Sequence, residues 1–170
     1  VSSQMWSTTG ARTLEKLVFK GTNLLTGAGL TDEQAETLIN AAAHQGEDWP
    51  ASRGLMDPDL ALNGYQDVLD RLDDQFAEDA ADMEMENQDR VDHLIRSLSD
   101  KISMQIAQNE AVIARLEFEG KTRTIPARRG KIKKLEGFRA IQTALFEKKR
   151  AISTEQRNVI TVAIHVGSSG

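Results

Sequence analysis

The sequence predicts a mainly α-helical protein, with a small N-terminal helical region, a long antiparallel helical hairpin of coiled-coil type and one C-terminal β-strand. Three observations predict this fold class. An apolar stripe from Val91 to Leu116 has a mean step between 3.5 and 3.6 residues, as in a helix that packs on a partner helix. A second stripe begins at Ile132. The segment from Asn158 to Val166 is rich in β-branched residues that mostly alternate, which indicates a strand.

Residues 1–63 are expected to form the small helical region with a loop. Near its start, Leu14, Leu17 and Val18 recur at helical spacing before Gly21 interrupts the pattern. This spacing predicts a short first helix.

A second helix is predicted over residues 32–44. Thr31 followed by Gln34 forms a capping-box pattern, which is typical of a helix N-terminus. The stretch 45–63 contains glycines and prolines and is expected to be a loop, with Trp49 holding it to the core.

Residues 64–89 are expected to be a helix followed by an acidic linker. Apolar residues from Tyr65 to Phe76 recur at three- and four-residue steps, which predicts an amphipathic helix. Only Arg71 and Arg90 offset the acidic residues in the next stretch, which are Asp73, Asp74, Glu78, Asp79, Asp82, Glu84, Glu86 and Asp89. Their order does not match a calcium-binding loop, so a solvated, partly disordered linker is the favoured interpretation.

The hairpin is predicted over residues 90–157. Gly120 is expected to end the first long helix, and a connection of about ten residues would reach Gly130. The second helix is marked by apolar residues from Ile132 to Ile152. At 1.5 Å per residue the pair would extend roughly 35 to 45 Å. Asn109 lies on the stripe, where a polar residue either fixes the register or marks a solvated helix face.

The strand predicted at Asn158–Val166 belongs to a terminal segment, residues 158–170. A solitary strand leaves its backbone groups unpaired. It therefore needs a neighbouring strand from the N-terminal region, a strand from a partner chain, or a sheet in a larger protein.

No group of residues in the sequence nominates a catalytic site. The chain has no cysteine, and His44, His93 and His165 lie in no metal-ligand spacing. Gly120-Lys121-Thr122 looks like the end of a phosphate-binding P-loop, but Arg115 occupies the position where the motif needs its first glycine. We therefore expect no cofactor, no metal and no catalysis by this chain alone.

The composition also bears on location. The sequence contains no stretch of roughly 20 apolar residues and no charged-then-apolar secretory leader. Together with the absence of cysteine, this predicts a cytoplasmic protein without membrane contact.

The most concentrated feature is a run of basic residues at the predicted hairpin tip, formed by Lys121, Arg123, Arg128, Arg129, Lys131, Lys133 and Lys134. Clustered cations of this kind suit contacts with the phosphates of DNA or RNA, which depend steeply on salt. A loop kept soluble by its charge, or one that pairs with an acidic partner, is the alternative. No aromatic residue lies between Lys121 and Lys134, so base stacking is not expected there.

The second half of the chain also resembles a known family. The resemblance is carried by the stripe leading into Gly120-Lys121-Thr122-Arg123, by the segment from Pro126 to Glu136, by Glu147-Lys148-Lys149-Arg150 and by the closing strand. Over Arg90–Val166 these features resemble the region that follows the motor in bacterial SNF2-type (RapA-like) helicases, several of which belong to phage-defence systems.

The resemblance implies an accessory, non-catalytic module of an ATP-dependent DNA helicase or translocase. No Walker lysine or Asp-Glu-x-His motif is present, so ATP hydrolysis would lie in the helicase motor as a partner or parent chain. The alternative is a coiled-coil structural or adaptor protein that binds another protein subunit or forms an oligomer.

Overall fold

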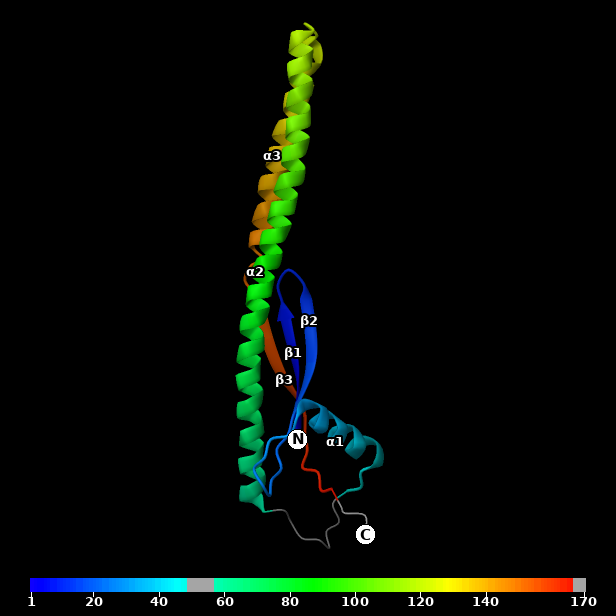
Figure 1. Ribbon diagram of the computed structural model, residues 1–170, viewed down its shortest axis with the longest axis vertical. Coiled ribbons are helices and arrows are strands. Elements are labelled where there is room, and N and C mark those ends of the chain that lie inside the picture. Colours follow the sequence, from blue (N-terminus) through cyan, green and yellow to red (C-terminus); the bar gives the residue numbers. More distant parts are fainter. Residues whose placement is uncertain (49–56, 167–170) are drawn as a thin grey trace. The chain divides into compact units, whose positions relative to one another are not determined.

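The computed structural model describes residues 1–48 and 57–166. Its elements, in chain order, are β1 (Ser2–Thr9), β2 (Thr13–Lys20), α1 (Asp32–Gln45), α2 (Pro58–Phe118), the 3-10 turn η2 (Thr122–Thr124), α3 (Ile125–Glu147) and β3 (Ser153–Thr161) (Figure 1). The described chain forms two compact units. The first contains residues 1–9, 13–48, 57–82 and 153–166, and the second contains residues 10–12 and 83–152. Helix α2 contributes residues to both.

A three-stranded antiparallel sheet forms the centre of the first unit. The strand order is β2-β1-β3, so the first strand of the chain lies between the second and the last (Figure 1). In this register Trp6 lies opposite Lys16 on β2 and Gln156 on β3. A register shift between Ser3 and Gln4 marks a bulge in the pairing of β1 with β3.

One face of the sheet packs on the part of α2 that belongs to the first unit. The apolar core is formed by Trp6, Val18, Val68 and Leu72, and all four side chains are buried. The Trp6 ring meets the edge of Phe76 with the ring centroids 5.2 Å apart. Such a pair stabilises the fold by about 1 kcal/mol beyond the contribution of the apolar area that the two rings bury.

Polar side chains continue this core toward β3. The Trp6 indole Nε1 donates to Gln4 Oε1 at 2.9 Å, and Gln4 Nε2 donates to Asn158 Oδ1 at 2.7 Å. The hydrogen bonds satisfy groups that would otherwise be costly to bury.

Helix α1 begins as its sequence predicts and packs against β2. Thr31 Oγ1 accepts from the Gln34 amide at 3.2 Å, and Gln34 Oε1 accepts from the Thr31 amide at 3.0 Å. The capping box is therefore confirmed. Asp32 also binds Lys20 Nζ at 2.6 Å, which ties the helix start to the end of β2.

The predicted fold class is wrong for the N-terminal region. Residues 1–20 form two strands instead of a helix, and the protein has a three-stranded sheet instead of one strand. Leu14, Leu17 and Val18 do recur at helical steps, but Val18 is buried because alternate residues of β2 face the core. Trp6 is the one large apolar residue on the buried face of β1. The other residues on that face are polar, so the alternation of apolar and polar residues that predicts a strand is not visible there.

The last strand also differs from its prediction. Strand β3 spans Ser153–Thr161 instead of 158–166, and α3 ends at Glu147 instead of continuing to Ile152. β3 is an edge strand with mainly polar residues on both faces, so its first half carries no apolar signal. Of the three neighbours that we considered for it, a strand from the N-terminal region is the one observed.

The second unit is an antiparallel helical hairpin formed by α3 and the second part of α2 (Figure 1). Val91, Ile102 and Ile113 of the predicted stripe are buried, and Ile125 is buried at the start of α3. The stripe predicted for the first helix is therefore confirmed. Among the apolar residues that mark the predicted second helix, Phe138, Ile141 and Leu145 are exposed, so the packed face of α3 was predicted only in part. The 23 residues of α3 correspond to a length of about 34 Å.

Two connections differ from expectation. The acidic stretch expected as a linker is continuous helix within α2. The turn between the two long helices is shorter than ten residues, because α3 already begins at Ile125 and includes Gly130. Pro126 lies in the first turn of α3, where a helix tolerates proline because that amide has no partner in the helix. The expected role of Trp49 lies outside the described residues.

Candidate functional site

The hairpin tip, which we define as residues 115–134, contains the end of α2, the connecting turn and the start of α3. Gly120 adopts a positive φ of 71°, which reverses the chain at the end of α2. The Lys121 amide donates to the Leu116 carbonyl at 2.9 Å, and the Gly120 amide donates to the Glu117 carbonyl at 3.1 Å. Because these amides cap the helix, they cannot cradle a phosphate as P-loop amides do.

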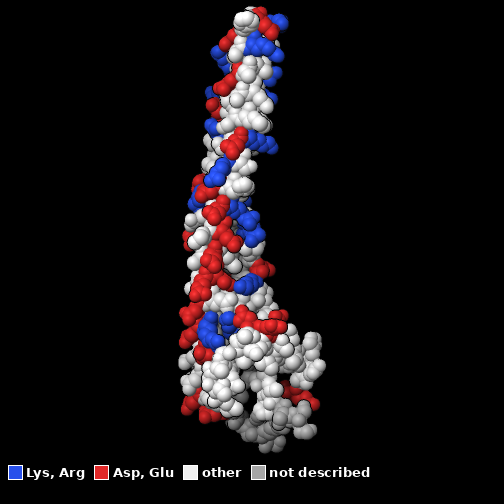
Figure 2. All heavy atoms as spheres, viewed as in Figure 1, with Lys and Arg blue, Asp and Glu red and all other residues white. Residues whose placement is uncertain are grey.

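The hairpin tip is strongly cationic. It contains eight basic and two acidic side chains, which gives a formal net charge of +6 in a chain whose total is −5. On the face seen in Figure 2, several Lys and Arg side chains lie near the closed end of the hairpin, with acidic and uncharged atoms among them. A charge concentration of this size attracts anions over about a Debye length.

Three of the seven predicted binding residues make contacts within the hairpin. Lys121 Nζ lies 3.0 Å from Glu119 Oε2, and an Arg129 guanidinium nitrogen lies 3.3 Å from Glu117 Oε1. Both pairs are exposed, so each holds its cation only weakly.

Arg128 is engaged more firmly. Its guanidinium donates to Asn109 Oδ1 at 3.1 Å, and Asn109 Nδ2 donates to the Gln105 carbonyl at 2.7 Å. The Asn109 side chain lies in the helix seam and is 5% exposed. Of the two interpretations of Asn109, the structure supports a polar seam residue that pairs across the hairpin. Arg128 lies three residues after Ile125 and four residues before Ile132, which is the spacing of residues that face the helix seam. The sequence therefore already indicated that Arg128 faces the seam.

The other four predicted binding residues, Arg123, Lys131, Lys133 and Lys134, have no ion pair within the described residues. All four are exposed. Arg123 lies in the 3-10 turn, and the lysines follow on α3. At 1.5 Å per residue, Lys131 and Lys134 lie about 9 Å and about 14 Å along the helix from Ile125.

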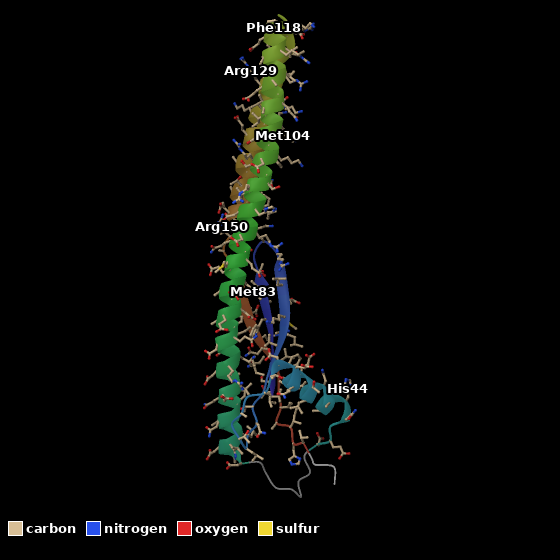
Figure 3. The ribbon with its side chains drawn as sticks, viewed as in Figure 1. His44, Met83, Met104, Phe118, Arg129 and Arg150 are labelled. Atoms are coloured by element: carbon tan, nitrogen blue, oxygen red, sulfur yellow. The ribbon has the colours of Figure 1, made fainter. Side chains whose placement is uncertain are left out.

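An exposed aromatic residue also lies at the tip, three residues before Lys121. Phe118 is the last residue of α2, and its side chain is 92% exposed. Figure 3 shows it at the closed end of the hairpin, above Arg129.

The opposite end of the hairpin is held by a polar clamp. Arg150 lies 2.6 Å from Asp92 and 2.7 Å from Glu147. Its hydrogen bonds hold the pKa of both carboxyls below their ordinary values. Asn87 adds donor bonds from Nδ2 to the Lys149 and Arg150 carbonyls at 2.9 and 2.8 Å.

Other features of the described chain offer no reactive site. No group of three or more His, Cys, Asp or Glu side chains in residues 1–48 and 57–166 is placed to hold a metal ion. The first unit has a cavity of about 560 Å³ that is lined mainly by aliphatic side chains, including Leu24, Leu38, Leu60 and Val162. This lining could accept an apolar group but supplies little to orient one.

Comparisons with known proteins identify no relative: no family model, no curated protein and no solved structure matches the chain. The resemblance to SNF2-type helicases therefore remains a prediction. Within the described residues, the helices lack a segment with the length and apolar character needed to cross a bilayer.

Proposed function

We propose that this chain is an accessory, non-catalytic module of an SNF2-like ATP-dependent DNA helicase or translocase. Its hairpin tip contacts nucleic-acid phosphates, and the ATP-hydrolysing motor lies in a partner or parent chain. The observation that carries the proposal is the tip charge of +6, in which Arg123, Lys131, Lys133 and Lys134 are exposed and have no ion pair among the described residues.

The charge distribution favours contacts with the nucleic-acid phosphates, which do not depend on the base sequence. Lysine and arginine ends attract phosphate oxygens without distinguishing bases. Four contacts on duplex DNA give a slope of log affinity against log salt of about −3.6, so binding weakens about 100-fold between 50 and 200 mM salt. Lys121 and Arg129 would join the contact if phosphate replaced their glutamate partners. Arg128 contributes charge while it remains in the seam.

The test is fluorescence anisotropy with labelled duplex and single-stranded DNA across that salt range. The test variant changes the four unpaired tip cations to Gln and keeps Arg128, because Arg128 also holds the seam. A matched control changes four exposed cations outside the tip to Gln: Arg90, Lys101, Lys148 and Lys149. Both variants have the same formal net charge, so a difference in their affinities shows whether the cations that bind DNA lie at the tip.

We expect salt-sensitive binding by the unchanged chain and by the control. In the tip variant we expect the salt slope on duplex DNA to decrease in magnitude by about 3.6. Equal binding by the two variants would overturn the proposed contact. Absence of binding by the folded, unchanged chain would overturn it as well.

A second candidate function is a coiled-coil adaptor that binds a protein subunit or associates with itself. The observation that favours it is an apolar stripe on α3 formed by Phe138, Ile141 and Leu145, which are 51%, 62% and 45% exposed. Their spacing places them on one face of the helix, and such a face can pack on another helix. Light scattering of the chain and of an Ile141→Lys variant tests self-association. A concentration-dependent rise in mass that the variant lacks would support it.

A further inference from the structure

The described molecule offers three places where a ligand or partner could bind beyond the phosphate contact. These are the aliphatic cavity of the first unit, the apolar stripe of α3 and the exposed aromatic residue at the hairpin tip. The first two have nothing beside them that selects an occupant. The third lies among cations, which limits the chemistry of a partner.

We infer that Phe118 is a stacking platform for an unpaired nucleobase, so that the hairpin tip binds single-stranded nucleic acid or a frayed duplex end in preference to intact duplex. This inference rests on the proposed phosphate contact and names the form of nucleic acid that it recognises.

The first argument is the exposure of Phe118. Its side chain is 92% exposed, whereas Ile125, which follows the same turn, is 6% exposed. The seam at the tip is therefore already closed by Ile125, and Phe118 adds almost nothing to the packing of the hairpin. A polar residue would serve equally well as the last residue of α2 if the position were only structural.

The second argument is the charge around it. Glu117 and Glu119 flank Phe118 in sequence, but each lies within salt-bridge distance of a cation, Arg129 and Lys121. The exposed ring therefore lies in a region of positive charge. Such charge does not help an apolar pocket on another protein to bind the ring, whereas a nucleotide offers a base that stacks on the ring and a phosphate that the cations attract.

The third argument is spacing. Lys134 lies about 14 Å along α3 from Ile125, at 1.5 Å per residue. Stacked nucleotides rise 3.4 Å each along one strand, so about four nucleotides cover this length. A strand of this length that begins at the connecting turn and runs along α3 therefore spans Lys131 and Lys134.

The experiment compares Phe118→Leu with a matched Phe19→Leu control, because Phe19 is a half-buried residue of β2 that lies outside the hairpin. Anisotropy is measured with a single-stranded oligonucleotide, a blunt duplex and a duplex with frayed ends, at one fixed salt concentration. A single-stranded probe with 2-aminopurine at its end reports stacking directly, because its fluorescence falls when the base stacks. Circular dichroism checks that each variant stays folded.

Base stacking contributes about 1–3 kcal/mol, so we expect Phe118→Leu to weaken single-strand binding by about 5- to 100-fold. We also expect it to remove the 2-aminopurine signal and to leave blunt-duplex binding and the salt slope unchanged. Phe19→Leu should behave like the unchanged chain.

The two proposals fail in different ways. If Phe118→Leu binds all three probes like the unchanged chain while the four-cation variant has lost duplex binding, the stacking platform is refuted and the phosphate contact stands. If the four-cation variant binds like its control, the phosphate contact is refuted and the stacking platform is refuted with it.

Discussion

The contact between Asn109 and Arg128 makes a quantitative prediction about how the hairpin is held together. Changing Arg128 to Ala leaves the Asn109 amide oxygen, in a side chain that is only 5% exposed, without its donor. Hydrogen bonds to charged groups contribute about 1.5–3 kcal/mol, and the half-buried guanidinium favours the lower value. We therefore expect Arg128→Ala to destabilise the hairpin by about 1.5 kcal/mol.

The measurement is native-state hydrogen exchange of amides in α2 and α3, because the two units need not unfold in a single step. A loss of 1.5 kcal/mol corresponds to exchange about ten times faster in the seam. A double-mutant cycle isolates the pair. In an Asn109→Ala background, Arg128→Ala should cost only its packing, which gives a coupling energy of about 1.5 kcal/mol.

Coupling near zero would contradict the reasoning, since the two side chains would then contribute independently. The prediction also affects binding experiments. A DNA-binding variant that includes Arg128→Ala would confuse loss of phosphate contact with loss of hairpin structure, whereas one built on Arg123, Lys131, Lys133 and Lys134 avoids this.

Two further predictions concern the other end of the hairpin. Asn87→Ala removes three hydrogen bonds, two to the Lys149 and Arg150 carbonyls and one from the Ala11 amide, and should destabilise the second unit by about 2–4 kcal/mol in native-state hydrogen exchange. Asn87→Asp should retain only the Ala11 bond, and equal stability of the two variants would contradict this account. Arg150 lowers the folded-state pKa of the carboxyls that it binds, so their stabilisation is complete above about pH 5 and is lost as the pH falls through the lowered pKa values. Arg150→Gln should raise both carboxyl pKa values in NMR titrations and should flatten this acid-side loss of stability, and unchanged pKa values would refute the clamp.

The hairpin seam could be predicted from the sequence because its apolar repeat is long and local. Ile102 and Ile113 belong to one helix with a single period, so each turn repeats the evidence for the last. The sheet could not be predicted in the same way. Its central strand begins Ser2-Ser3-Gln4, three polar residues that are buried, and the Ser2 and Gln4 side chains form hydrogen bonds with β3.

The candidate site was predicted in composition and missed in detail. The run of cations is evident in the sequence. Whether a cation faces the seam, as Arg128 does, or faces solvent, as Lys131 does, depends on which face of α3 packs on α2. The spacing of Ile125, Arg128 and Ile132 contains that information and could have been used. Phe118 was missed because it precedes the basic run in sequence and joins it only when the turn at Gly120 folds the two helices together.

The pairing of β1 with β3 has a consequence for how long the hairpin can be. Trp6 lies opposite Gln156, so the sheet closes a loop of about 150 residues. Because closure entropy varies only with the logarithm of loop length, removing two heptads from each helix would change that cost by about 0.2 kcal/mol. Shortening or extending the hairpin in whole heptads therefore leaves the cost of closing the sheet almost unchanged. The distance from clamp to tip can be altered, in evolution or in the laboratory, as a nearly independent variable.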